Sequence, residues 1–361
     1  MKPTQHQPLP RPPLQARLRR RLSCVIGAMG LFSVVFVVPP VHPGERNGSS
    51  EEQTLGLWPA PPAEPRVAYV QSIAGPEDLG IRPSAWSRVG NWVTGAGKGR
   101  ERFVKPFGLA FDEADNLCVT DTGTGWVWYF DRKHKTARHW EKVGHLQFVS
   151  PVAVAKRKGI FYVADSVLGK VLAFDARGRV RFEIDGQLER PSGLVISGGR
   201  LFVSDAAAHR VAAFDLSGEF RFAFGKRGAA PGEFNFPTYL TADGDGLLLV
   251  TDSMNSRIQV FDSEGRFQRL IGSVGDASGH FSRLKGIAAD GLGHVYAVDA
   301  LFDNFQIFDR EGRFLLGVGT SGSRPGEFWL PSGIAIDQNH QLFVADSYNH
   351  RLQAFKYLGG P

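Results

Sequence analysis

The sequence predicts an all-β fold, a six-bladed β-propeller, on three observations. A short apolar run that ends in Asp, followed by a turn and a second apolar run, occurs six times. Successive markers lie 40 to 47 residues apart, which is the period of propeller blades. Each repeat also divides into strand-like pieces separated by turn residues. The marker residues are Asp121, Asp165, Asp205, Asp252, Asp299 and Asp346.

The last repeat contains three strands, over residues 331–337, 341–346 and 351–355, and the chain ends before a fourth. In the complete repeats a Gly turn leads to a fourth strand, as in residues 217–225. Residues 66–73, ahead of the first repeat, have the same fourth-strand pattern. We therefore expect this N-terminal strand to pair with residues 351–355, because closure of the ring removes exposed sheet edges.

Three segments precede the propeller, which is predicted over residues 66–361. Residues 1–21 are basic, residues 22–38 are uncharged and mostly apolar, and residues 39–65 contain seven prolines. As a helix the apolar segment would span about 25 Å, which predicts a signal-anchor transmembrane helix followed by an extended, Pro-rich linker. The preceding arginines predict a cytoplasmic N-terminus, and so an inner-membrane anchor with the propeller in the periplasm. The alternative is a cleaved signal and a secreted protein.

The net charge of +6 does not predict a nucleic-acid partner. Six basic residues and no acidic ones lie in the first 21 positions, so 36 basic and 36 acidic residues balance from Leu22 onward. Of the two cysteines, Cys24 lies in the apolar segment. Cys118 takes a strand position that is apolar or aromatic in the other repeats, which predicts a buried thiol and not a disulfide.

The repeats resemble NHL repeats. The resemblance is carried by PSGIAID before LFVADSYNHRLQAF, by PTYLTAD before LLVTDSMNSRIQVFD, and by the linkers GKRGAAPGEFNFP and GTSGSRPGEFWLP. Repeat five departs with Asn304 where Arg is usual, and repeat one with Trp126. The resemblance implies a six-bladed propeller, and the tethered layout is similar to that of exported bacterial NHL proteins without an assigned activity. Some NHL-type propellers are lyases with a channel zinc held by histidines from several blades.

The loops that follow the six aspartates are expected on one face, together with the connections between blades. Six carboxylates around a channel could suggest calcium. Every blade needs this turn, however, so we interpret the aspartates as structural acceptors of backbone N–H groups. A specific binding site should instead break the repeat. The candidates on this face are Trp126, Lys170, His209, Arg210, Arg257, Phe302, Asn304, Tyr348, His350 and Arg351.

No motif predicts catalysis: GxSxG, HExxH, P-loop and CxxC patterns are absent. His209 and His350 fall at equivalent positions in opposite repeats, but catalytic zinc needs about three protein ligands. We therefore expect no catalytic residue, no metal and no other cofactor. The expected function is non-catalytic binding of a protein, peptide or small ligand. The alternative is a metal-dependent lyase or hydrolase at the channel mouth, which three or more converging His, Asp or Glu side chains would favour.

One further segment lies between the closing strand and the first repeat. Ser84 can cap a short helix there that carries Trp86, Val89 and Val93 on one face. This helix would either pack on the rim of the propeller or cover the channel as a lid or a partner-docking element.

Overall fold

The computed structural model of the protein describes residues 56–81 and 101–359. The predicted apolar helix and the segment Ser84 to Val93 lie outside these ranges. The described residues contain no α-helix, and no helix among them is long and apolar enough to cross a membrane. Three short 3-10 helices are η1 (Pro76–Leu79), η2 (Ser253–Asn255) and η3 (Ser347–Asn349).

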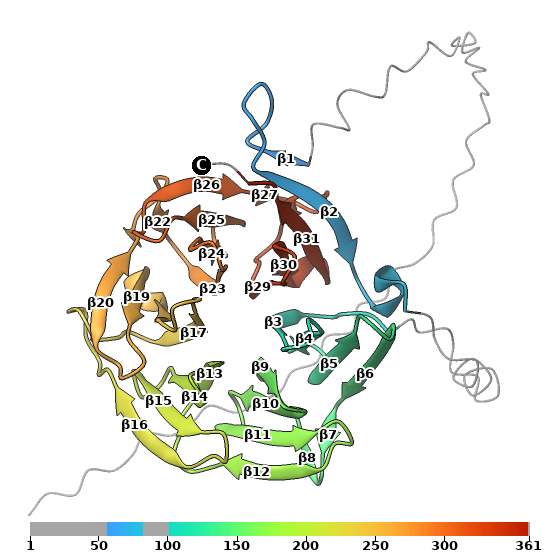
Figure 1. Cartoon of the computed structure of the whole chain (residues 1–361), viewed down its shortest axis with the longest axis vertical. Helices are drawn as coiled ribbons and strands as arrows, with labels where there is room; N and C mark the ends of the chain where they lie inside the picture. The colour runs from blue at the N-terminus through green and yellow to red at the C-terminus, as the bar shows by residue number, and fades with distance from the viewer. Residues whose placement is uncertain (1–55, 82–100, 360–361) are drawn as a thin grey trace, which may run out of the picture. The chain divides into compact units, whose positions relative to one another are not determined.

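Six antiparallel sheets form the blades of a propeller, and the first strand of each blade lies innermost (Figure 1). The prediction of a six-bladed propeller is confirmed. The strands of blades 1 to 3 are β3 (Pro106–Phe111), β4 (Leu117–Asp121), β5 (Trp126–Asp131) and β6 (Thr136–Trp140); β9 (Pro151–Arg157), β10 (Ile160–Asp165), β11 (Lys170–Asp175) and β12 (Val180–Ile184); and β13 (Pro191–Ser197), β14 (Arg200–Asp205), β15 (Arg210–Asp215) and β16 (Phe220–Phe224).

Blades 4 to 6 follow the same order, with two further strands in the last. They consist of β17 (Pro237–Ala242), β18 (Leu248–Asp252), β19 (Arg257–Phe261) and β20 (Phe267–Ile271); β23 (Leu284–Ala289), β24 (Val295–Asp299), β25 (Asn304–Phe308) and β26 (Phe314–Val318); and β29 (Ile334–Ile336), β30 (Gln341–Asp346), β31 (Arg351–Tyr357), β2 (Val67–Ile73) and β1 (Leu57–Trp58). Two-residue strands between blades are β7 (Lys142–Val143), β8 (Leu146–Gln147), β21 (Ser273–Val274), β22 (His280–Phe281), β27 (Thr320–Ser321) and β28 (Glu327–Phe328).

The N-terminal strand closes the ring as predicted. Strand β2 pairs antiparallel with β31, and Val67 lies opposite Tyr357 while Ile73 lies opposite Leu352. Strand β1 then pairs with β2 and adds a fifth strand to blade 6. The sheet therefore begins inside the segment predicted as linker, at Leu57 rather than at residue 66.

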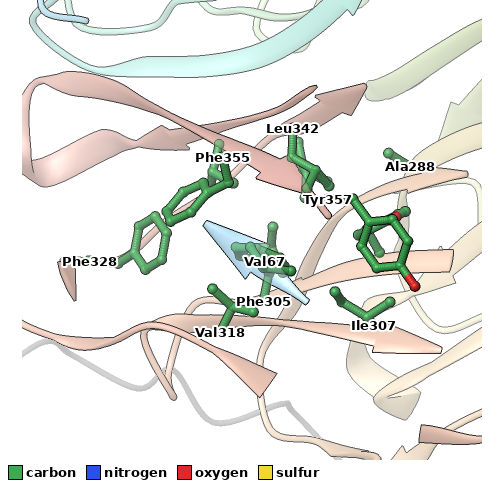
Figure 2. Packing of buried hydrophobic residues seen from close by; sticks show 13 residues of the cluster. Val67, Ala288, Phe305, Ile307, Val318, Phe328, Leu342, Phe355 and Tyr357 are labelled. Atoms are coloured by element: carbon green, nitrogen blue, oxygen red, sulfur yellow. The ribbon is translucent and has the colours of Figure 1, made fainter. Parts of the chain in front are cut away.

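The apolar core is divided into six clusters, and each lies between two neighbouring blades. Figure 2 shows the cluster between blades 5 and 6, where Val67 of the closing strand packs with Phe305, Phe328 and Phe355. The ring centroids of Phe305 and Phe355 are 5.4 Å apart. Full burial of one such ring contributes about 1.5–3 kcal/mol, so these clusters hold neighbouring blades together. Cys118 is buried without a disulfide in the cluster between blades 1 and 2.

Candidate functional site

One face of the propeller consists of the loops between the second and third strands and of the connections between blades. The six marker aspartates join each loop to a connection by hydrogen bonds. Each side chain is fully buried, and each accepts backbone N–H bonds from the connection into its own blade. Asp121 accepts from Val104 at 2.7 Å and Lys105 at 2.9 Å, and from Gly123 in its own turn at 2.9 Å. The carboxylates therefore lie inside the blades. We call the face formed by these loops and connections the Asp-loop face.

Two predicted candidates, Arg257 and Arg351, belong to the same network. Each is the cross-strand partner of its aspartate, and its Nε donates to Asp252 or Asp346 at 2.8 Å. The other N–H groups donate to backbone carbonyls of the preceding connection, which are those of Ala229, Ala230 and Glu233 in blade 4 and of Arg324 and Glu327 in blade 6. Both guanidinium groups are thus engaged in structural hydrogen bonds.

The residue that lies opposite the marker aspartate on the third strand differs in blades 5 and 3. In blade 5 it is Asn304, whose Oδ1 is buried without a hydrogen-bond partner among the described residues. In blade 3 it is Arg210, whose Nη2 donates to the carbonyl of Gln187 at 2.8 Å and lies 3.6 Å from Asp205. Neither side chain reproduces the network of blades 4 and 6, because Asn304 is too short and Arg210 has no second carbonyl bond in the described chain.

In blades 2 and 1 the residue opposite the aspartate contacts the fourth strand of its own blade or the residue that follows this strand. Lys170 pairs with Asp185 at 2.8 Å and with Glu183 at 3.2 Å. Trp126 stacks on His139, with ring centroids 4.0 Å apart. Both residues have partners within their own blade, so neither presents a free group to a ligand.

His209 and His350 each contact the next blade. Both occupy a turn position with positive φ, at 54° and 57°. His209 Nδ1 accepts the N–H of Phe236 at 3.2 Å, and His350 Nδ1 donates to the carbonyl of Val104. All six blades have positive φ here, and the other four residues are Gly125, Gly169, Ser256 and Asp303. The structure does not bring the two histidines together.

Two aromatic candidates lie on the same face in different settings. Tyr348 is 40% exposed and packs against Trp329, with ring centroids 5.6 Å apart. Lys105 lies 4.8 Å from the centroid of the Tyr348 ring. Phe302 is part-buried, and its N–H donates to Asp299 at 3.2 Å. Tyr348 is therefore the more accessible of the two.

The Asp-loop face carries most of the exposed large apolar side chains. Nine of the fourteen that the described residues contain lie in its loops and connections, and one of these, Val274, belongs to β21. The other eight, which we call the exposed apolar set, are Val104, Val149, Val167, Phe236, Met254, Leu301, Trp329 and Tyr348. Tyr348 was a candidate from the sequence, and Met254 likewise departs from the repeat in its loop. Apolar side chains gathered on one face are typical of an interaction surface.

The central channel is closed below this face by the first strands. Phe107 of blade 1 stacks on Tyr239 of blade 4, with ring centroids 5.6 Å apart. Blades 1, 3, 5 and 6 have glycine at the position that Tyr239 takes in blade 4, and a Cβ there would lie only 2.2 to 2.4 Å from a neighbouring carbonyl oxygen; they are Gly108, Gly193, Gly286 and Gly333. The cavity around Tyr239 measures about 40 Å³. This volume has room for water and not for an organic ligand.

Four cations stand at the mouth of the channel, and the sequence reasoning missed them. The residue before the first strand is basic in blades 1, 3 and 5, as Lys105, Arg190 and Arg283, which we call the cationic ring. Ser150, Phe236 and Leu330 take this position in blades 2, 4 and 6. Lys285, in blade 5, is the fourth cation. The signal is an alternation at one repeat position, which lies in the connections and outside the Asp loops.

Lys285 has neither an ion pair nor a hydrogen bond within the described chain. It occupies the strand position of Phe107, which reaches the channel axis, and it is part-buried. Burial lowers the pKa of Lys285, and the positive charges of Arg283, Lys105 and Arg190 lower it further. Four positive charges therefore meet at the mouth of the channel.

Metal-ligating side chains do not converge in the described part of the chain. No group of three or more His, Cys, Asp or Glu residues there could hold a metal ion. The condition that would have favoured a metal-dependent enzyme is thus not met within residues 56–81 and 101–359.

Comparison with known proteins agrees with this architecture. The NHL repeat family matches residues 234–261 and 328–355, in blades 4 and 6. The chain therefore carries NHL repeats on a six-bladed β-propeller. No match was found among curated protein sequences.

Several solved structures share the fold. A streptogramin B lyase structure is 12% identical, with 70% of this chain and 94% of that chain covered and a TM-score of 0.52. The virginiamycin B lyase of Staphylococcus aureus is 12% identical, with 71% and 96% covered and a TM-score of 0.53. The hydrazine synthase of Kuenenia stuttgartiensis is 13% identical, with 71% and 97% covered and a TM-score of 0.51. At these identities the likeness concerns the fold alone.

Proposed function

We propose that this chain is a non-catalytic binding propeller that holds a protein or peptide partner on its Asp-loop face. The exposed apolar set carries the proposal, because eight large apolar side chains in the loops of one face are costly to hydrate without a partner. The buried network beneath them supports the same role, since it fixes the loops that present these side chains. An extracytoplasmic, membrane-tethered location is part of the proposal and rests on residues 1–21 and 22–38 of the sequence.

The proposal is tested by removing apolar contacts from this face only. The double variant Met254→Ser and Leu301→Ser changes two side chains that are 66% and 58% exposed, so the fold should be unaffected. Partner capture by crosslinking in the native cells should fall at least about tenfold, which corresponds to roughly 1.4 kcal/mol of binding energy. The matched control is Leu292→Ser, which is 60% exposed in the opposite turn between β23 and β24. Equal capture by both variants would contradict the proposal.

A further inference from the structure

The mouth of the channel has an excess of positive charge that the fold itself does not use. The cationic ring occupies one position in alternate blades, and the backbone N–H of each member is held by a buried aspartate. The N–H of Lys105 donates to Asp121 at 2.9 Å, and that of Arg190 donates to Asp205 at 2.8 Å. Arg283 donates in the same way to Asp299 at 3.1 Å. The three backbone positions are therefore fixed around the axis.

The side chains of the ring are only weakly engaged elsewhere. Arg190 and Arg283 are exposed, and neither side chain has an ion pair in the described chain. Lys105 contacts the Tyr348 hydroxyl at 3.4 Å. Its nearest polar partner is thus neutral, so its charge is not compensated there.

Two acidic residues of the connections on this face are already paired with other cations. Glu233 pairs with Lys226 at 3.3 Å, and Glu327 with Arg324 at 2.8 Å. Glu189, beside Arg190, is exposed. None of them is among the causes of the lowered pKa of Lys285, which are burial and the three ring cations. A part-buried lysine without an acidic partner is costly to the fold, so a binding role explains its presence.

From this arrangement we propose that Lys285 and the cationic ring form a binding site for an oxyanion, a carboxylate or a phosphate group. The anion sits at the mouth of the channel, above the Phe107 and Tyr239 stack, where Lys285 and the guanidinium groups donate charge-assisted hydrogen bonds. The exposed apolar set on the same face contacts the rest of the ligand. The inference deepens the proposed function, since it gives the partner an anionic group, but the anion site is measurable without any partner.

The test is an isothermal titration of the full chain with inorganic phosphate and, separately, with acetate at constant ionic strength. Both wild type and Lys285→Arg should bind one of these anions, and Lys285→Met should bind it at least about tenfold more weakly. Lys133→Met, which removes a lysine charge from the exposed turn between β5 and β6, should bind like wild type. Preference for acetate assigns the site to a carboxylate of the partner, and preference for phosphate assigns it to a phosphate-bearing group.

Two results would overturn the inference. Wild type binds neither phosphate nor acetate, or Lys285→Met and Lys133→Met weaken anion binding equally. If Lys285→Met does not fold, the exposed pair Arg190→Ser and Arg283→Ser provides the same comparison. The anion site and the proposed function can fail independently. Loss of partner capture with intact anion binding would contradict only the docking of a protein on the exposed apolar set.

Discussion

Blades 4 and 6 surround their buried aspartates with the same side chains, whereas blade 5 keeps the aspartate and loses the arginine. In blades 4 and 6 an Asn, an Arg and a Gln tie the aspartate to the preceding connection; they are Asn255, Arg257 and Gln259, and Asn349, Arg351 and Gln353. In blade 5, Gln306 alone remains, bonded to Gly279 at 2.9 Å and His280 at 2.7 Å.

This difference separates scaffold from site. The two blades with the full network are the two that match the NHL family, and both place Phe or Leu ahead of the first strand. Blade 5 departs from the network and supplies Arg283 and Lys285, half of the cations at the channel mouth. Repeated side chains therefore hold the connections, whereas Arg283 and Lys285, which vary between blades, have no ion pair in the described chain.

The largest difference between blades 6 and 5 is expected when the residue opposite the aspartate is removed. Arg351→Ala leaves Asp346 buried without its guanidinium partner and removes the donor to the carbonyl of Arg324 and one of two donors to the carbonyl of Glu327. We expect a loss of about 3–5 kcal/mol in the free energy of unfolding, measured by chemical denaturation. Asn304→Ala, at the equivalent site, should change it by less than about 1 kcal/mol, since its Oδ1 has no partner in the described chain. Similar losses in both variants would show that blade 5 is held like the others.

A smaller effect of opposite sign is expected at Lys285. Its pKa in the folded protein is lowered from 10.5, so the charged lysine is less favourable in the folded protein than in the unfolded chain, and this group reduces stability at neutral pH. Lys285→Met should therefore raise the free energy of unfolding by about 1 kcal/mol. The gain over wild type should shrink as the pH rises through the lowered pKa towards 10.5, because the wild-type lysine becomes neutral. A gain independent of pH, or a loss of stability, would contradict the electrostatic account.

The fold was predictable because propeller blades repeat. The spacing of the six aspartates located the second strand of each blade, and the fourth-strand pattern of residues 66–73 identified the closing strand. Strand β1 was not predicted, because Leu57 and Trp58 lie among prolines and glycines and form a strand only by pairing with β2. A two-residue strand has no periodicity of its own to detect.

The candidate site was predicted less well. The sequence offered Arg257 and Arg351 as binding candidates, but it could not show that their aspartates and backbone carbonyls from another segment use each guanidinium. His209 and His350 share a turn position, and only their hydrogen bonds to Phe236 and Val104 reveal that both side chains reach the next blade. Lys285 was missed because its charge matters only once blades 1, 3 and 5 surround the channel.

The central claim, that the Asp-loop face is the binding surface, is tested most directly by photocrosslinking from two sites of equal exposure. A photoreactive amino acid is placed at Val167, 65% exposed in the loop between β10 and β11, or at Leu292, 60% exposed on the opposite face. In the native cells a discrete crosslinked species should form from position 167 and be absent from position 292. The same species from both positions, or from position 292 alone, would contradict the claim.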